Sequence, residues 1–422
     1  MKNVLNTLSP TKRMILDILY EYRGMTFNQL VDKLAFSLGK TAHETYRRNA
    51  YKNFQDLTEE KLIVTDAIRF ENKNVNFYYL TETGLQVAYE IRDLQPGYIG
   101  KGFWGDLGEF SYELQRPPKN NVLHHIMTTD VFLKINTIMD KHWDREITYR
   151  DNRYCSASYE IDGKMYRFRP DGEIEIGKKK FLLEVDRGSE YLEALQKKFL
   201  GYNNYFEWCE KNNKELPEGL IFITSSDTKY GINRRLITAQ QAFLSRMTQW
   251  CLNFNMSFGT VDELGGFILS EDNCSEHNKQ WLDIISFYAH GKNGVGKVQQ
   301  LTEGPGKICN TKIYYNFVKT SNDSLRLFVY ERYETSGTAA IIRLLETYQY
   351  FKSYEKTEFE FVPVLYYSEG QPKTLNFQGL QNETIVKKIF SNTLWLNIKS
   401  DARTRWASSN GRTIDVGNPL LQ

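Results

Sequence analysis

The stretch that decides the fold runs from Arg167 to Tyr205 and reads RFRPDGEIEIGKKKFLLEVDRGSEYLEALQKKFLGYNNY. Apolar Ile174 and Ile176 alternate with polar residues, a glycine follows, and an apolar run begins at Phe181. Alternation and a short apolar run on either side of a turn predict a β-hairpin. The stretch after the hairpin has helical spacing. The sequence therefore predicts two antiparallel strands followed by an amphipathic helix.

Three acidic residues are expected to meet at the end of this hairpin. Residues two apart in a strand share a face, so Glu184 and Asp186 project together. If the hairpin places Asp171 opposite them, three carboxylates converge, and such a group is costly to bury unless a divalent cation binds it. Mg²⁺, or Mn²⁺ in its place, is the expected ion, because carboxylates, waters and phosphate oxygens bind it. The alternative is a strand end whose acids form salt bridges with Arg169 and Arg187.

These residues resemble a known nuclease core. An Asp, a gap, an acid-x-acid group at a strand end and an amphipathic helix are similar to the PD-(D/E)xK pattern. The sequence motif RPDG followed by FLLEVDRGSE resembles the replication-relaxation family of plasmids and integrative elements, which includes relaxase-like proteins. The resemblance covers roughly the first half of the chain. The resemblance implies a metal-dependent nicking endonuclease that starts plasmid transfer or replication. Asp186 stands where the pattern has a lysine, so a catalytic lysine would have to come from elsewhere.

The following helix offers such a lysine. With about 100° per residue, its apolar face consists of Leu192, Leu195, Phe199, Tyr202 and Phe206. Lys198 lies at the edge of that face, and Lys197 points to solvent. Lys198 is therefore the candidate to hold an attacking water or to stabilise charge on the phosphate, and the alternative is a lysine that snorkels to solvent. A covalent tyrosyl mechanism stays open, with Tyr191 and Tyr202 nearest to the site.

Residues 1–92 predict a winged helix-turn-helix. Ser9 and Pro10 mark a helix start, and Thr26 marks the start of a second helix. A third helix is expected from about 42 to 60, followed by two strands on either side of a polar turn at 71–74. This order of helices and strands is that of a winged helix.

The third of these helices has the composition of a recognition helix. The polar and basic side chains opposite its apolar face are Thr41, Arg48, Lys52 and Gln55, with Arg47 on the flank. Arginine suits guanine edges or phosphate, glutamine suits adenine, and lysine suits phosphate. The helix therefore predicts binding of double-stranded DNA, and the runner-up is a winged helix used for protein pairing. Acid and base nearly balance over this domain, which predicts modest DNA affinity alone and help either from a second subunit in a homodimer or from the rest of the chain.

A glycine- and proline-rich stretch, 93–121, predicts a linker before a nuclease-like domain at 122–290. A long amphipathic helix opens that domain, with His124 in the middle of its apolar face, Asp130 at the edge, and His125 facing out. The resemblance implies that His124 belongs to the site, since family members carry a histidine in the helix that packs against the sheet. The alternative is a satisfied core histidine.

Later segments complete an α/β arrangement. Tyr149–Tyr159 and Lys164–Phe168 predict a strand pair, and Leu220–Thr224 predicts a buried parallel strand after the helix. Arg234 and Arg235 at a helix start could meet a phosphate, although a solvated face is the favoured interpretation.

Residues 291–422 predict a second, degenerate α/β unit. Without gaps, residues 312–351 lie over residues 167–206, which puts Glu331 over Asp186 and Arg343 over Lys198. In this alignment Asn316 stands over Asp171 and Val329 over Glu184, so the metal positions are lost. The P-loop-like stretch at 291–297 is followed by a valine in place of Ser or Thr, which argues against ATP binding.

Composition limits the remaining possibilities. The 422 residues carry a net charge of only +2, so DNA contact must come from local patches. The 5 cysteines are widely spaced and no stretch reaches membrane-spanning length, which predicts a cytoplasmic protein with reduced thiols. The predicted class is α+β / α/β, and the expected partners are an origin sequence in double-stranded DNA and the transfer or replication machinery. Two alternatives stay open: a catalytically inactive origin-binding regulator, and a host-defence or repair nuclease.

Overall fold

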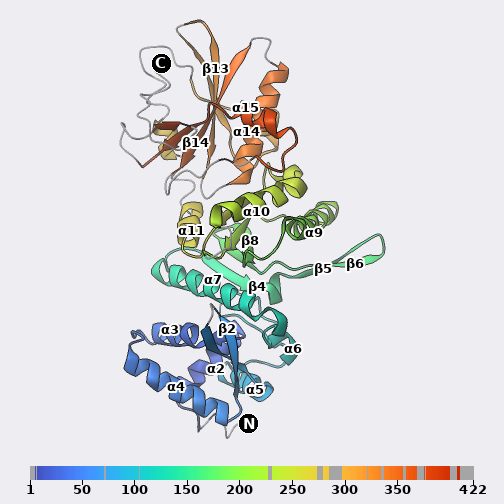
Figure 1. Cartoon of the computed structure of the whole chain (residues 1–422). Coiled ribbons are helices and arrows are strands. Elements are labelled where there is room, and N and C mark those ends of the chain that lie inside the picture. The colour runs from blue at the N-terminus through green and yellow to red at the C-terminus, as the bar shows by residue number, and fades with distance from the viewer. Residues whose placement is uncertain are drawn as a thin grey trace. The chain divides into compact units, whose positions relative to one another are not determined.

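The chain, for which we have a computed structural model, divides into two compact units (Figure 1). Unit 1 comprises residues 1–156 with 171–173, and unit 2 comprises 157–170 with 174–422. The structure describes residues 5, 7–70, 73–103, 105–226, 231–272, 279–284, 297–320, 322–333, 337–354, 358–367, 375, 377–399 and 406–408. Part of the predicted wing turn, 71–72, and the P-loop-like residues 291–296 lie outside the described residues.

Unit 1 begins with helices and a small antiparallel sheet. Its first elements are α2 (Pro10–Tyr22), β1 (Met25–Thr26), α3 (Phe27–Ser37), α4 (Glu44–Glu59), β2 (Ile63–Phe70), β3 (Lys73–Leu80) and α5 (Glu82–Ile91). The Ser9 side chain accepts a hydrogen bond from the backbone N–H of Lys12, and Thr26 forms a capping box with Gln29. Both predicted helix starts are therefore confirmed.

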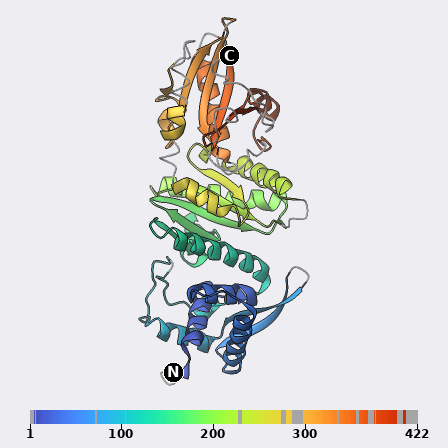
Figure 2. The same cartoon turned by 90° about the vertical axis from the view of Figure 1, so that its left-hand side faces the viewer.

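The small sheet has the strand order β1-β3-β2, and β2 and β3 pair from Ile63 opposite Leu80 to Phe70 opposite Lys73. Figure 2 shows this hairpin, in blue, extending away from the helices of unit 1. Helix α4 buries Ala50, Phe54 and Leu57, which share one side of the helix. The opposite side of α4 stays exposed.

The rest of unit 1 consists of α6 (Tyr112–Gln115), η1 (Lys119–Asn121), α7 (Val122–Lys141), β4 (Ile147–Asp151) and α8 (Asn152–Cys155). The stretch predicted as a linker packs on the first helices: Tyr20 Oη donates to the Gly108 carbonyl at 2.5 Å, and Tyr89 Oη donates to the Phe110 carbonyl at 2.6 Å. The prediction of one continuous strand over 149–159 is wrong, because the short helix α8 separates β4 from β5. Asp151 caps α8 by accepting from the Arg153 N–H, and the cap ends β4.

Unit 2 contains a mixed sheet in which β10, β9, β8 and β7 follow one another. Its elements are β5 (Ala157–Ile161), β6 (Lys164–Phe168), β7 (Gly172–Ile176, whose first residues belong to unit 1), β8 (Lys179–Asp186), α9 (Leu192–Lys211), β9 (Gly219–Thr224), α10 (Ile232–Met247), η2 (Thr248–Trp250), β10 (Asn255–Gly259) and α11 (Leu264–Asp272). Strands β8, β9 and β10 run parallel. Every residue of β9 is buried, as the short apolar run predicted.

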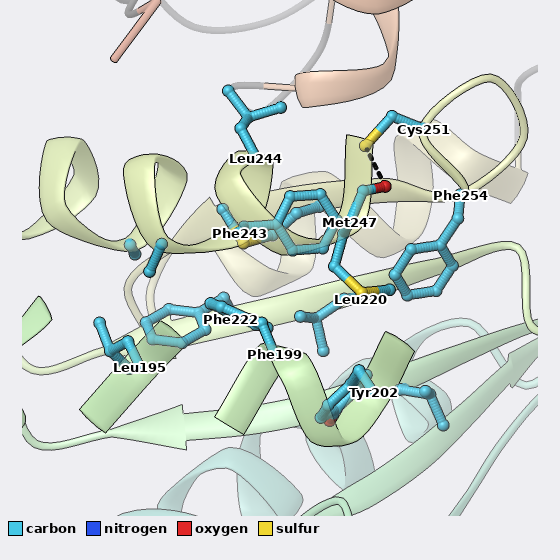
Figure 3. Close-up of a cluster of buried hydrophobic side chains, with 14 of the residues drawn as sticks. Leu195, Phe199, Tyr202, Leu220, Phe222, Phe243, Leu244, Met247, Cys251 and Phe254 are labelled. Atoms are coloured by element: carbon cyan, nitrogen blue, oxygen red, sulfur yellow. Dashed lines mark hydrogen bonds between the residues drawn. The ribbon is translucent and has the colours of Figure 1, made fainter. Parts of the chain in front are cut away.

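Helices α9 and α10 cover one face of this sheet. Figure 3 shows Phe199 and Tyr202 of α9 with Phe243 and Met247 of α10, around Phe222 of β9. The residues of α9 in this cluster recur every three or four positions, so one stripe of the helix faces the strands. The resulting core fixes both helices against the sheet.

The second half of unit 2 has its own sheet, with the order β11-β12-β13-β14-β15-β16. Its elements are β11 (Gln299–Gln300), α13 (Pro305–Ile308), β12 (Tyr314–Lys319), β13 (Leu325–Arg332), α14 (Thr338–Tyr354), β14 (Phe359–Tyr367), α15 (Glu383–Ile389), β15 (Leu394–Asn397) and β16 (Trp406–Ser408). The hairpin β12–β13, the helix α14 and the parallel strand β14 follow the succession of β7–β8, α9 and β9. This agreement supports the internal repeat that the sequence alignment indicated.

A buried ion pair joins β13 to α14 in this second half. Arg343 donates to both carboxylate oxygens of Glu331 at 3.0 Å, and the two residues are 8% and 1% exposed. Burial raises the pKa of Glu331, and the Arg343 charge acts in the opposite direction. Each of these buried charged groups needs the other as its counter-charge, because little of either is in contact with solvent.

The substitution Glu331→Gln is expected to lower the free energy of unfolding by about 3–5 kcal/mol, because it leaves the Arg343 guanidinium buried without a counter-charge. Chemical denaturation of the full chain, followed by tryptophan fluorescence, measures this loss. Glu360→Gln is the matched control: Glu360 pairs with Arg326 in the same sheet, but these side chains are 39% and 34% exposed. The control is expected to cost less than about 1 kcal/mol, and equal losses would contradict the importance of the buried pair.

Candidate functional site

The end of β8 places two buried acids on the sheet face that α9 and α10 cover. Glu184 and Asp186 are each 3% exposed, and as alternate residues of a strand they project to the same side. Glu184 contacts α9, and Asp186 contacts α10. Buried carboxylates need partners of opposite charge or several hydrogen bonds, and the two helices supply them.

Glu184 is held by two side chains of α9. Lys198 Nζ lies 2.9 Å from Oε2 of Glu184, and Tyr202 Oη donates to Oε1 at 2.5 Å. Lys198 and Tyr202 are four residues apart, so they occupy neighbouring positions on one face of the helix. Lys198 also lies 3.8 Å from a carboxylate oxygen of Glu190. The lysine proposed from the sequence thus meets an acid of the strand end, at the edge of the apolar face.

Asp186 is held by Arg235 of α10. Its two oxygens accept from Nε and Nη2 of Arg235 at 2.6 and 2.7 Å, and Thr224 Oγ1 donates to Oδ2 at 3.1 Å. A bidentate guanidinium–carboxylate contact of this kind is both strong and directional. Arg235 is 7% exposed, so the solvated face that the sequence favoured for it is wrong. The cause is a long-range contact: Arg235 meets Asp186, 49 residues earlier in the chain, and helical spacing cannot show such a contact.

These contacts decide how well the acids suit a metal ion. The oxygens of Asp186 already accept from a guanidinium and a hydroxyl, and those of Glu184 from an ammonium and a phenol. Among the residues that the structure describes, no group of three or more His, Cys, Asp and Glu is placed to hold a metal. As they stand, the two side chains fit protein cations better than Mg²⁺. The salt bridges of the alternative interpretation are present, but with Lys198 and Arg235 in place of the exposed Arg169 and Arg187.

A second group of predicted site residues lies in unit 1. His124 Nε2 of α7 lies 3.1 Å from Oδ2 of Asp171, and the two side chains are 24% and 15% exposed. Asp171 immediately precedes Gly172, where an added Cβ would lie 3.0 Å from the Phe132 ring and 3.1 Å from the Arg150 carbonyl. Glycine therefore allows the chain to pass close to α7 and β4 at this point. Asp130 accepts from Gln29 Nε2 at 2.7 Å.

Asp171 belongs to unit 1, whereas Glu184, Asp186 and Lys198 belong to unit 2. The structure brings together His124 with Asp171 in the first unit, and Glu184 with Lys198 in the second. The arrangement of Asp171 with Glu184 and Asp186 stays a prediction.

The neighbouring His125 differs from its prediction. It is buried, its Nε2–H donates to the Gly24 carbonyl at 3.0 Å, and its ring meets the edge of Phe77. The prediction that His125 faces out is wrong because α7 is packed on more than one side within unit 1, including against β1. Burial is the main cause that lowers the pKa of His125 to about 3.

The exposed side of α4 carries the residues predicted to bind DNA. Arg48, Lys52 and Gln55 are exposed, and Thr41 is exposed just before the helix. The Arg48 side chain is 79% exposed, and its Nε is 3.5 Å from a carboxylate oxygen of Glu44. Arg47 is different: it donates to Asp32 and Asn28, and its side chain is 26% exposed.

Sequence reasoning missed two roles in unit 2. Tyr202 was assigned to the apolar face, yet its hydroxyl binds Glu184, and its position four residues after Lys198 was the available signal. Arg235 had no such signal, because its partner Asp186 lies 49 residues earlier in the chain. Tyr191, the other tyrosine considered for covalent chemistry, is 80% exposed at the start of α9.

Comparison with known proteins adds a family match. Residues 16–218 match the model of the replication-relaxation family. No curated protein matches the chain. A crystal structure of protein VC1899 from Vibrio cholerae is similar at 13% identity and a TM-score of 0.23, covering 65% of this chain and 57% of that chain. This chain thus spans little more than half the length of that protein. In the part of the chain that the structure describes, no helix is long and apolar enough to cross a membrane.

The buried His125 predicts a pH dependence of stability. The folded state keeps the imidazole neutral down to a pKa of about 3, whereas the unfolded chain binds the proton near the ordinary pKa of about 6.5. As the pH falls below about 6.5, the free energy of unfolding should therefore drop by up to about 1.4 kcal/mol per pH unit. Denaturation of wild type and His125→Gln at several pH values measures the difference.

In this experiment His125→Gln is expected to make the free energy of unfolding fall less steeply as the pH is lowered. His142→Gln, at the C-terminal end of α7, is the control and should leave it in place. An unchanged decline in His125→Gln would show that other groups cause it.

Proposed function

We propose that the chain is a DNA-binding protein that acts at the origin of a plasmid or integrative element during replication or transfer. The family match over residues 16–218 supports the biological setting. The observation that carries the proposal is the exposed face of α4, on which Arg48, Lys52 and Gln55 lie. These residue types suit guanine, phosphate and adenine.

In this proposal the first elements of unit 1 act as a winged helix. Helices α2 and α3 and the β2–β3 hairpin hold the apolar side of α4, and the hairpin serves as the wing. Such a helix enters the major groove, where base edges can be read. Because the net charge is only +2, a second copy of the chain would raise the number of phosphate contacts. A homodimer on double-stranded DNA, together with the transfer or replication machinery, is therefore part of the proposal.

A second candidate is a nicking endonuclease that uses the strand end of β8. The contact between Lys198 and Glu184 at 2.9 Å favours it, since a lysine beside an acid is the arrangement that the PD-(D/E)xK pattern needs. The bidentate contact between Arg235 and Asp186 favours the binding protein without nuclease activity, because it occupies the second acid. Of the two, the binding protein accounts for more of the observed contacts.

Arg48→Ala and Lys52→Ala are each expected to weaken binding of duplex DNA about five- to tenfold and to reduce the slope of log affinity against log salt by about 1. Fluorescence anisotropy with a labelled duplex that carries the element's origin measures both quantities. Lys141→Ala, at the exposed end of α7, is the matched control and should change neither. Equal effects of all three substitutions would contradict a role of the α4 face.

A supercoiled plasmid that carries the same origin distinguishes the two candidates. Incubated with wild type and Mg²⁺ or Mn²⁺, the plasmid is expected to be bound and to stay supercoiled, because the acids of β8 are ion-paired. Open circles with wild type that disappear with Glu184→Gln and with Lys198→Ala would establish the nicking endonuclease instead.

A further inference from the structure

Unit 1 has a cavity beside α4 that the proposed contacts of the α4 face do not use. Its volume is about 450 Å³, within the range of small-molecule sites. The cavity is lined by the start of α3, by Tyr51 of α4, by Phe70, Asn74 and Asn76 of the β2–β3 hairpin, and by Asp130 of α7. It therefore lies between the helix and the hairpin that are proposed to meet DNA.

Aromatic rings from separate elements form part of its wall. Phe27, Tyr51 and Phe70 come from α3, α4 and β2, and Tyr51 is 41% exposed. The rings of Phe27 and Tyr51 lie 6.0 Å apart at 70°. An exposed aromatic ring at an open cavity offers a face on which a planar ligand can stack. Stacking of a nucleobase on such a ring stabilises the bound base.

Polar groups complete the lining. The amides of Asn28, Asn74 and Asn76 each provide a donor and an acceptor, which is the combination that the edge of a nucleobase requires. The carboxylate of Asp130 can only accept, so it favours the amino group of adenine, cytosine or guanine over thymine, whose single ring N–H lies between two carbonyl oxygens. Gln29 donates to Asp130 at 2.7 Å and thereby orients this carboxylate.

Positive charge lies next to the cavity. The guanidinium of Arg47 lies 5.3 Å from the centre of the Phe27 ring, and Arg47 also donates to Asn28 of the lining. A nucleotide whose base enters the cavity would need such a charge for its phosphate. Planar rings, amide groups, a carboxylate and a neighbouring arginine together match a nucleotide better than an apolar ligand.

We propose that this cavity binds one unpaired nucleobase of DNA, with a preference for bases that carry an amino group over thymine. The proposal rests on the proposed DNA-binding function and adds to it the form of DNA that the unit recognises. A base released from the duplex would stack on Tyr51 and present its edge to the asparagines and Asp130. Bases leave a duplex most easily where it is mismatched or already opened.

The test measures anisotropy with labelled oligo-dA, oligo-dC and oligo-dT of equal length. Wild type is expected to bind oligo-dA and oligo-dC more tightly than oligo-dT. Tyr51→Ala should weaken binding of the two preferred oligonucleotides about tenfold, and Asp130→Asn should remove the preference. Lys52→Ala is the matched control, because Lys52 adjoins Tyr51 on α4 but does not line the cavity; it should weaken binding to all three alike.

Other results would overturn the proposal. If Tyr51→Ala and Lys52→Ala weaken all three oligonucleotides alike, the cavity is not a base site, although the DNA-binding function stands. If wild type binds neither duplex nor oligonucleotide, the proposed function fails, and thermal unfolding with dAMP and dTMP then tests the cavity alone. Stabilisation by dAMP that Tyr51→Ala and Asp130→Asn both abolish would support a nucleobase site, and no response to dAMP would reject it.

Discussion

The ion pair between Asp186 and Arg235 is the constraint on which the arrangement of unit 2 depends. A charge at the end of a buried strand is costly unless a partner of opposite sign is held in place. Arg235 supplies that partner only because α10 begins early enough to present it, while Lys198 and Tyr202 of α9 satisfy Glu184 in the same way. The acids of β8 therefore fix both covering helices to the sheet, in addition to the apolar core shown in Figure 3.

The second half of unit 2 contains a comparable ion pair at the end of a strand, but without further acidic residues at the aligned positions. Glu331 and Arg343 form a buried pair between strand and helix. In the sequence alignment Val329 stands over Glu184, and Asn316 stands over Asp171 of unit 1. No acidic cluster is expected there, yet the ion pair persists. This comparison indicates that the pair at the strand end has a structural role of its own.

Local signals made much of the fold predictable, whereas contacts between distant residues were not. The caps at Ser9 and Thr26 and the apolar run of β9 act within a few residues, so the sequence shows them directly. The burial of Arg235 was missed because its partner Asp186 lies on another element, 49 residues earlier in the chain. His125 was missed because helical periodicity identifies one apolar face, and α7 has neighbours on more than one side. The sequence indicated Lys198, His124 and the acids as residues of the candidate site. It did not indicate which side chain each of them contacts.

A double-mutant cycle on Asp186 and Arg235 tests the central claim most directly. The free energy of unfolding is measured for wild type, Asp186→Asn, Arg235→Met and the double mutant. If the pair stabilises the strand end as described, the coupling energy should be about 2–3 kcal/mol, since both groups are buried and in direct contact. A coupling energy below about 0.5 kcal/mol would contradict the account, because the two side chains would then act independently and the acids of β8 would need another explanation.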